Sequence, residues 1–476
     1  MTNYRFLILC LIFFLAAATS APAQSQSQYL HLTRPDSLTY PALQFKPPQA
    51  ERLKLPNGMI IYILADHELP LVNIHAVMKA GAYFDPDGKE GLAELTGTLM
   101  RTGGTELMSG TEIDEELEAL AIDINLAAQM ENCTISFSSL KNNLDRGMEI
   151  LSRIVRQPVF AEDKLLLARN LKMEELRRIG DDHQQFAFRE FNRVLYRGNP
   201  RGRLPSLTSV KKITRDDLQQ FHQRYYNPDN IMVAITGDIT KPEALALLEK
   251  YFGNWPKKGT PAEILPPPNS LQAGLFYLAK DVPQSVVITG RFAPAKKSAD
   301  FYPFTVLDFI LGSGGFRSRI FQEIRTNLGL AYSAGSFYRP KGDYGVLGTY
   351  AMTKSSTTGK ALSLLRSITA RIKSESIGAG ELAWAKKSLN NSFIFSFRST
   401  EQIAKQQLML EFDQLPQDYL LTYQDRITRV SSEEVARVAG RYLLPEETVT
   451  LVMGQEKDFD QPLTAFGRVE TLVPHD

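Results

Sequence analysis

The chain has 476 residues, of which 43% are apolar and 22% charged, and its 54 basic side chains are balanced by 53 acidic ones. Such a balance gives no support for a nucleic-acid partner or for attachment to an anionic membrane surface. The length exceeds what one hydrophobic core usually organises, so the sequence predicts at least two domains.

The N-terminal residues have the pattern of a secretory signal peptide. Arg5 precedes an apolar run over residues 6–18, and Ala21-Pro22-Ala23 supplies the small residues of a cleavage site. The run is shorter than the about 20 residues that a membrane span requires. We expect residues 1–23 to be removed on export, with an uncleaved anchor as the alternative. No span is expected after removal, and residues 24–49 are expected to form an extended arm.

Cysteine usage is compatible with export to a bacterial periplasm. Of the two cysteines, Cys10 lies inside the predicted signal and Cys133 is the other. One remaining cysteine cannot form an intramolecular disulfide. Cys133 also lies in a strand-like segment with no nearby histidine, which gives no support for cysteine catalysis. We therefore expect a secreted, periplasmic protein.

Residues 50–255 are predicted to form the first domain, in which strands and helices alternate. Asn57-Gly58 predicts a tight turn between neighbouring strands. This mixture predicts an α+β fold, with a largely antiparallel sheet and helices on one face. The expected strands are 60–65, 72–80, 122–127 and 134–139, and the expected helices are 91–101, 142–156, 163–179 and 186–196.

The rest of the chain repeats the first domain at a constant offset of 217 residues. The matching positions are apolar residues of one helical face, N-caps, and the prolines and glycines that flank a strand. A proline-rich linker over residues 256–270 therefore separates two tandem homologous domains, the second over residues 271–476. The matching pairs are Met148 with Leu365, Leu151 with Ile368, Val155 with Ile372, Thr214 with Ser431, Tyr225 with Tyr442, Pro228 with Pro445 and Gly237 with Gly454.

Several short segments in this order resemble the insulinase/pitrilysin-type zinc metallopeptidase family, which includes mitochondrial processing peptidase. The resemblance runs from about residue 50 to residue 455 and implies two domains that face each other across a cleft. The segments are Leu55-Pro56-Asn57-Gly58, Gly91-Leu92-Ala93, Gly103-Gly104-Thr105, Tyr226-Asn227-Pro228, Pro283-Gln284-Ser285, residues 318–325 and Gly329-Leu330-Ala331-Tyr332.

The zinc motif of that family is degenerate in this chain. The family places His-x-x-Glu-His on a helix, whereas the corresponding positions here are Glu94, Gly97 and Thr98. Glu175 fits the position of the family's third ligand. Two carboxylates would suit only a hard cation, and weakly, so the favoured interpretation is a surface residue at Glu94 and a solvated or ion-paired remnant at Glu175. We expect no metal and no catalytic residue on this chain alone.

The second half cannot replace the motif, because its corresponding positions are Val306, Phe309 and Ile310. The six histidines also include no pair spaced by three or four residues. Residues 312–315 are glycine-rich but match no nucleotide fingerprint, and a turn before a helix at Phe321 is the favoured interpretation. In the family a comparable stretch has been linked to substrate handling.

Arg325 and Tyr332 resemble the family's substrate-binding Arg/Tyr pair. The guanidinium of such a pair can bind a peptide carbonyl or carboxylate, and the phenol can donate a hydrogen bond to an oxyanion. The alternative is that Arg325 pairs with Glu323 or Asp308 and that Tyr332 only packs.

The resemblance therefore implies a non-catalytic subunit of a secreted heteromeric zinc peptidase. Zinc is expected on a homologous partner subunit, and the ligand is expected to be a peptide. A structural or peptide-binding scaffold of the cell envelope is the alternative. An independent metallopeptidase would require a metal site that the sequence does not contain.

Overall fold

The computed structural model describes residues 46–259, 263–267 and 271–475. The predicted signal peptide and the predicted arm up to residue 45 lie outside the described residues. Residues 47–476 form one unit, and the following paragraphs concern that unit alone.

The first half builds a sheet whose described strands lie in the order β1-β2-β6-β3-β5-β4. The β2–β6 pair is parallel and the other pairs are antiparallel. The predicted strands and helices lie within a few residues of their expected bounds, and β1, α3, α7 and α9 are additional. The elements are β1 (Glu51–Lys54), β2 (Ile60–Ala65), β3 (Leu71–Met78), α2 (Leu92–Thr102), α3 (Gly110–Ala119), β4 (Asp123–Ala128), β5 (Cys133–Leu140), α4 (Leu144–Arg156), α5 (Glu162–Arg178), α6 (His183–Leu195), α7 (Leu207–Lys212), α8 (Arg215–Tyr225), β6 (Ile231–Gly237) and α9 (Lys241–Phe252).

The second half builds a sheet in the order β12-β7-β11-β8-β10-β9, again within the described residues. The β12–β7 and β7–β11 pairs are parallel and the others antiparallel. Two π-helices, Phe309–Ser313 and Phe321–Asn327, interrupt its helical segments. The remaining elements are β7 (Gly274–Ala279), β8 (Gln284–Ala293), α10 (Phe301–Asp308), β9 (Ala331–Pro340), β10 (Gly345–Lys354), α11 (Thr358–Ser374), α12 (Ala379–Ile394), α13 (Thr400–Phe412), α14 (Tyr419–Arg429), α15 (Ser432–Tyr442), β11 (Val449–Gly454) and β12 (Val469–Leu472).

Both halves end in the order helix, turn and strand. Thr214 and Ser431 each cap a helix through a capping box, in which the side chain three residues later binds back to the cap. A short 3-10 turn that begins at Pro228 or Pro445 follows each helix and leads into β6 or β11. Because the two sheets also share their central strand order, the α+β class and the organisation in two similar halves are confirmed.

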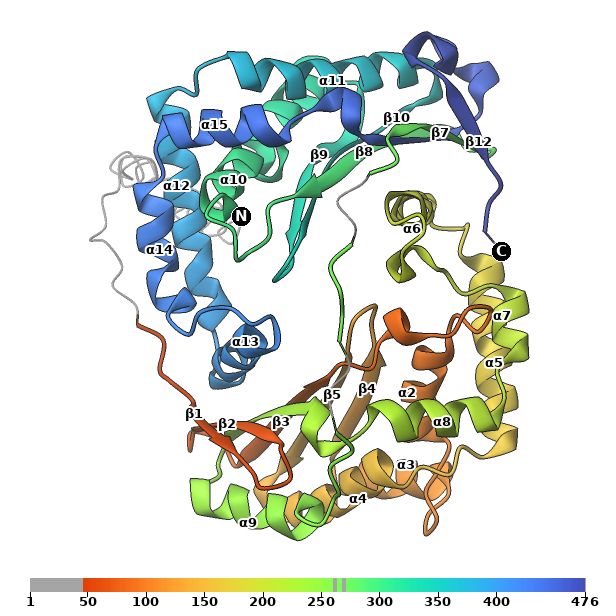
Figure 1. Ribbon diagram of the computed structural model, residues 1–476, viewed down its shortest axis with the longest axis vertical. Helices are drawn as coiled ribbons and strands as arrows, with labels where there is room; N and C mark the ends of the chain where they lie inside the picture. The colour runs from red at the N-terminus through yellow and green to blue at the C-terminus, as the bar shows by residue number, and fades with distance from the viewer. Residues whose placement is uncertain (1–45, 260–262, 268–270, 476) are drawn as a thin grey trace, which may run out of the picture. The chain divides into compact units, whose positions relative to one another are not determined.

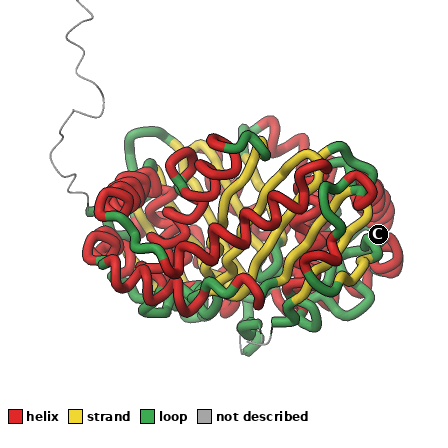
Figure 2. The backbone as a smooth tube through the Cα atoms, turned by 90° about the horizontal axis from the view of Figure 1, so that it is seen from above, coloured by secondary structure: helices red, strands yellow, loops and turns green. Residues whose placement is uncertain are grey.

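Each sheet exposes one face to the helices of its own half and the other face to a helix of the other half (Figure 1). On the first sheet, α13 packs against β2 and β6, where Ala404 and Leu408 meet Tyr62, Val77 and Ala234. On the second sheet, α6 packs against β8 and β11. Each sheet therefore has the helices of its own half on one face, as the sequence predicted, and a helix of the other half on the opposite face. Figure 2 shows helices in red across the yellow strands on the side that faces the viewer.

Ionic contacts accompany the packing of α13 against the first sheet. Glu411 on α13 accepts two hydrogen bonds from Arg52, at 2.6 Å each, and one from Tyr62 at 2.5 Å. Elsewhere Glu131, in the turn between β4 and β5, accepts hydrogen bonds from Arg201 at 2.7 Å and from Tyr344 of the second half at 2.8 Å. The two halves are thus joined at several separate places.

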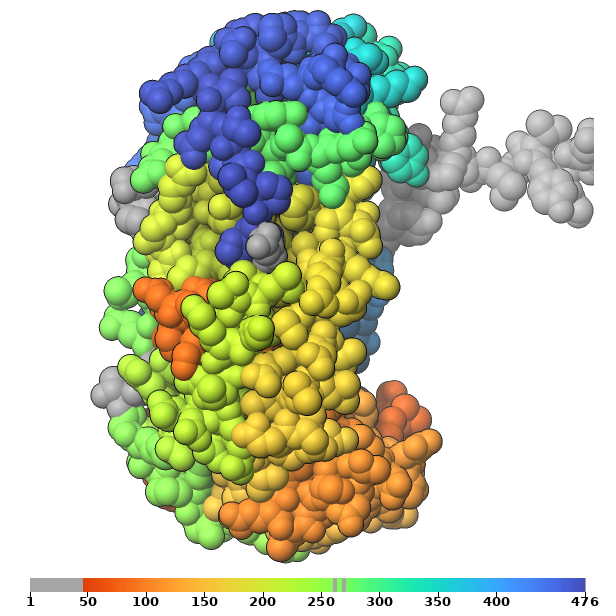
Figure 3. All heavy atoms as spheres, turned by 90° about the vertical axis from the view of Figure 1, so that its right-hand side faces the viewer, coloured from red at the N-terminus to blue at the C-terminus, as the bar shows by residue number. Residues whose placement is uncertain are grey.

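The end of the described chain lies against α6 of the first half. Arg189 donates to the carbonyl of His475 at 3.1 Å, and Arg193 donates to the carbonyl of Val473 at 3.0 Å. Figure 3 shows the C-terminal segment in blue next to yellow residues of the first half. Glu190, which is fully buried, pairs with both arginines.

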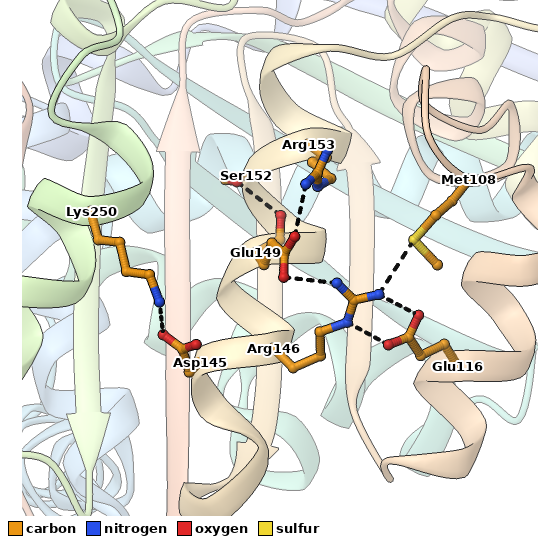
Figure 4. Close-up of polar contacts among 8 residues, drawn as sticks. All are labelled: Met108, Glu116, Asp145, Arg146, Glu149, Ser152, Arg153 and Lys250. Carbon is orange, nitrogen blue, oxygen red and sulfur yellow. Dashed lines mark hydrogen bonds and ion pairs between the residues drawn. The ribbon is translucent and has the colours of Figure 1, made fainter.

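On the outer side of the first half, a polar network fixes α3 on α4 (Figure 4). Arg146 binds Glu116 of α3 and Glu149 of its own helix, the latter at 2.7 Å. Glu149 also accepts a hydrogen bond from Arg153 at 2.8 Å. These pairs link α3 to α4. In the part of the chain that the structure describes, no helix has the length and apolar character needed to cross a bilayer.

Candidate functional site

The degenerate motif lies at the start of α2, whose position is fixed by a buried carboxylate. Asp85 accepts hydrogen bonds from the backbone N–H groups of Gly91 and Ala93, at 2.8 Å each, and so caps the helix. Gly91 has a φ of 103°, which favours glycine. Burial nevertheless raises the pKa of Asp85 to about 7. The chain therefore enters α2 at a defined angle, with residue 94 facing α5.

Lys172 of α5 joins the two carboxylates that correspond to family ligand positions. Its Nζ lies 2.7 Å from Glu94 Oε1 and 2.9 Å from Glu175 Oε1. The lysine side chain is 9% exposed, whereas those of Glu94 and Glu175 are 43% and 59% exposed. Glu94 and Glu175 are thus brought together as the resemblance implies, and an ammonium lies between them.

The residues at this site do not fit zinc. A zinc site uses three or four nitrogen, sulfur or carboxylate ligands, and a neighbouring ammonium opposes the charge of a cation. Gly97 supplies no side chain and packs near Cys133 Sγ, while Thr98 points to solvent. Among the described residues, no group of three His, Cys, Asp or Glu side chains could hold a metal ion.

A cavity of ≈ 360 Å³ opens beside this ion pair, between α2 and α5. Its lining includes Thr98, Lys164, Leu167 and Leu171, and the two leucines are 53% and 63% exposed. The cavity contains no activated nucleophile. Nearby Cys133 is buried, and this burial raises the pKa of its thiol to about 11, so the thiol is protonated at neutral pH.

Arg325 and Tyr332 meet in the second half, where the guanidinium lies on aromatic rings. Arg325 Cζ is 4.7 Å from the ring centre of Phe321, 5.0 Å from that of Tyr332 and 5.8 Å from that of Phe316. Tyr332 is 79% exposed and Phe316 is 71% exposed. The arrangement places a half-buried guanidinium beside an exposed phenol.

Glu323 and Asp308, the two carboxylates that could pair with Arg325, bind other side chains. Glu323 forms an ion pair with Arg371. Asp308 is buried and accepts a hydrogen bond from Ser336 at 2.5 Å, and burial raises the pKa of this carboxyl to about 6. Among the described residues, neither carboxylate forms an ion pair with Arg325.

The glycine-rich residues 312–315 lie where the π-helix Phe309–Ser313 ends and a short 3-10 helix, Gly315–Arg317, begins beside this ring cluster. A Cβ on Gly314 would lie 2.6 Å from the ring of Trp384, so only glycine allows this close approach. Gly315 has a φ of 67°. The predicted turn is limited to Gly314, because helical segments include the other three residues, and the helix that contains Phe321 is a π-helix. π-Helical turns occur frequently at functional sites.

Sequence reasoning identified Glu94, Glu175, Arg325 and Tyr332 but overlooked Lys172 and the rings around Arg325. Lys172 lies three residues before Glu175, a spacing that usually marks a solvated ion pair on a helix surface. The burial of the ammonium arises from α2, which no local pattern reveals. Phe316 and Phe321 could have been noted as aromatic residues beside a glycine-rich turn.

Two family models match the chain. The model described as insulinase (peptidase family M16) matches residues 61–205, and the model described as the peptidase M16 inactive domain matches residues 212–389. Together these ranges span more than half of the chain. The chain belongs to the insulinase (peptidase M16) family.

Particular relatives carry names of two kinds. An uncharacterized zinc protease of Rickettsia bellii is 24% identical over 405 residues, covering 84% of this chain and 90% of its own length. A non-peptidase homologue of Helicobacter pylori is 25% identical over 397 residues, covering 83% and 91%. The crystal structure of a peptidase M16 inactive domain from Pseudomonas fluorescens has a TM-score of 0.80 at 22% identity and covers 87% of this chain and 100% of its own. That likeness shows the fold, and the function has to be argued from the site.

Proposed function

We propose that this chain is the non-catalytic subunit of a secreted heteromeric zinc peptidase. In this proposal a homologous partner subunit holds the zinc, and this chain contributes Arg325 and Tyr332 to the peptide bound there. The observation that carries the proposal is the contrast between the two halves. An ammonium holds the carboxylates of the degenerate motif, whereas the half-buried Arg325 lies against the exposed ring of Tyr332 and forms no ion pair with any described carboxylate.

The chemistry of the pair supports a role in peptide binding. A guanidinium that stacks on rings keeps its N–H edge free for a carbonyl or carboxylate of the substrate. The Tyr332 hydroxyl can donate a hydrogen bond to an oxyanion, a contact that typically changes kcat by about 10²–10³-fold. The N-terminal pattern supports export to the periplasm.

Reconstitution with a zinc-bearing homologue from the same genome tests the proposal. Cleavage of a fluorogenic peptide by the mixture is expected to fall by about 10²-fold with Tyr332→Phe and to fall with Arg325→Ala. Arg178→Gln, which removes a similar charge from a surface ion pair on α5, serves as the control. Thermal unfolding of each variant verifies its fold. Equal cleavage by wild-type and Tyr332→Phe mixtures would contradict the proposal.

A peptide-binding scaffold without a role in cleavage is the second candidate. The exposed rings of Phe316 and Tyr332 favour it, because they can bind a peptide without any metal. Peptide binding by the isolated chain, together with no cleavage in any mixture, would support this alternative. Stoichiometric zinc in the purified chain with chelator-sensitive cleavage would instead support an independent metallopeptidase.

A further inference from the structure

We infer that five side chains of the second half form a docking surface for acidic peptide segments. The residues are Phe316, Arg317, Phe321, Arg325 and Tyr332, and we call them the arginine–aromatic surface. The preferred ligand is a peptide in which a carboxylate lies beside an aromatic or large apolar side chain. The inference rests on the proposed function, because Arg325 and Tyr332 belong to both.

The two arginines of this surface carry charge that no carboxylate neutralises. Arg317 is exposed and lies over the ring of Trp384, with 5.1 Å between Cζ and the ring centre. Arg325 lies over three rings. Within the described part of the chain, neither arginine forms an ion pair. Each therefore retains hydrogen-bond donors for a ligand.

Neighbouring arginines show that carboxylates are present in this region but are used by other side chains. Arg319 binds Glu381 and Glu375, at 2.9 Å each. Arg371 pairs with Glu323. Because these acids already have partners, a carboxylate of a ligand could form ion pairs with Arg317 and Arg325. The charge complementarity thus favours an acidic ligand over a basic one.

Large apolar side chains surround the free charges. Phe316 is 71% exposed and its ring centre lies 4.7 Å from that of Phe321. Tyr332 is 79% exposed, and Leu328, in the turn before it, is 44% exposed. A group of exposed rings beside unpaired arginines is typical of recognition surfaces. The rings would cover an apolar side chain of the ligand.

The stacked geometry orients each guanidinium for a carboxylate. A ring contact leaves the N–H groups of a guanidinium without a hydrogen-bond acceptor, so they can donate two parallel hydrogen bonds to a carboxylate. The rings also exclude water from one side, which strengthens the ion pair compared with a fully solvated one. Lysine would supply the charge without this planar match.

Backbone features at Gly314 and in the π-helix Phe321–Asn327 position the side chains of this surface. Gly314 approaches Trp384 so closely that a Cβ would lie 2.6 Å from the ring, and this approach positions Arg317 over the same ring. The π-helix Phe321–Asn327 then places Phe321 and Arg325 on one side. The surface is therefore specific to this local fold.

Binding of matched peptides to the isolated full chain tests the inference. Three labelled peptides of equal length would carry the same aromatic residues with interspersed aspartate, asparagine or lysine, and affinity would be measured by fluorescence anisotropy. The aspartate peptide is expected to bind about tenfold more tightly than the lysine peptide, with an advantage that shrinks as salt increases.

Substitutions in the arginine–aromatic surface test whether the peptides bind there. Arg317→Gln is expected to reduce the preference for the acidic peptide severalfold, and Phe316→Ala is expected to weaken binding of all three peptides. Arg178→Gln on α5 removes the same charge from the first half and is expected to leave the preference unchanged. Equal affinity for acidic and basic peptides, or an unchanged preference in a folded Arg317→Gln variant, would overturn the inference.

The outcome is separable from that of the proposed function. Acidic preference in the isolated chain with no Tyr332-dependent cleavage in a mixture would contradict only the subunit role. Tyr332-dependent cleavage without acidic preference would contradict only the arginine–aromatic surface.

Discussion

Lys172 holds carboxylates from two helices with a single ammonium. Glu94 comes from α2 and Glu175 from α5, so the lysine contributes a cross-helix contact at the place where the family has its metal motif. Without the ammonium of Lys172, two negative groups would lie close together with no counter-charge between them. The positive charge that a metal would bring is thus supplied by the chain itself.

Replacing Lys172 by methionine tests this account. The change retains most of the apolar stem but leaves Glu94 and Glu175 facing each other without a counter-charge. Because both carboxylates are substantially exposed, we expect the free energy of unfolding to fall by only about 1 kcal/mol. Denaturant unfolding measures the loss. Glu94→Gln and Glu175→Gln added to Lys172→Met should recover most of it.

Lys164→Met provides the matched control, because Lys164 lies on the same helix and lines the same cavity. It is expected to change stability by less than Lys172→Met. Zinc is expected to leave the thermal unfolding of the wild-type chain unchanged. Equal effects of the two lysine variants, or stabilisation of the wild type by zinc, would show that Lys172 does not act as the counter-charge.

The close packing of α6 on the second sheet requires a glycine in β8 at the point of contact. Phe191 of α6 lies over Gly290, and a Cβ at that position would lie 2.6 Å from the phenyl ring and 2.7 Å from the carbonyl of Leu347. Phe191 is fully buried in the cluster that joins α6 to this sheet. The close approach of helix and strand therefore depends on one residue.

Gly290→Ala is expected to lower the free energy of unfolding by about 1–3 kcal/mol, because the added methyl overfills the contact between α6 and β8. Gly440→Ala on α15 is the matched control, since no atom lies within 4 Å of the added Cβ. That control is expected to raise stability by about 0.5–1 kcal/mol, the helix preference of alanine over glycine. A Gly290→Ala variant as stable as the control variant would disprove this account of α6 docking.

Sequence patterns predicted most strands and helices of the first half from their apolar periods, but not β1, α3, α7 and α9. They could not predict that α6 and α13 each pack on the sheet of the other half, since an apolar helix face does not specify which sheet it covers. The same limit applies to the site. Arg325 and Tyr332 were identified by resemblance, but the contact of Arg325 with Phe316 and Phe321 depends on a π-helix, whose period is hard to distinguish from that of an α-helix.

Each half of the molecule supplies a helix, α6 or α13, that covers the sheet of the other half, so neither half buries both faces of its sheet alone. The first half would lose the cover that α13 provides, and the second would lose that of α6. The contacts of Glu411 with Arg52 and of Glu131 with Tyr344 add to the interface. The linker between the halves contains no helix or strand in its described parts, 256–259 and 263–267. Association of the halves should therefore not depend on the covalent connection.

A protease recognition sequence inserted between residues 259 and 263 tests this conclusion. After complete cleavage, the two fragments are expected to elute together in size-exclusion chromatography and to separate only in denaturant, because each fragment supplies a helix to the core of the other. Ala404→Glu, which places a charge in the buried contact between α13 and the first sheet, should weaken association. Separation of the cleaved wild-type fragments under native conditions would show that the exchanged helices do not hold the halves together.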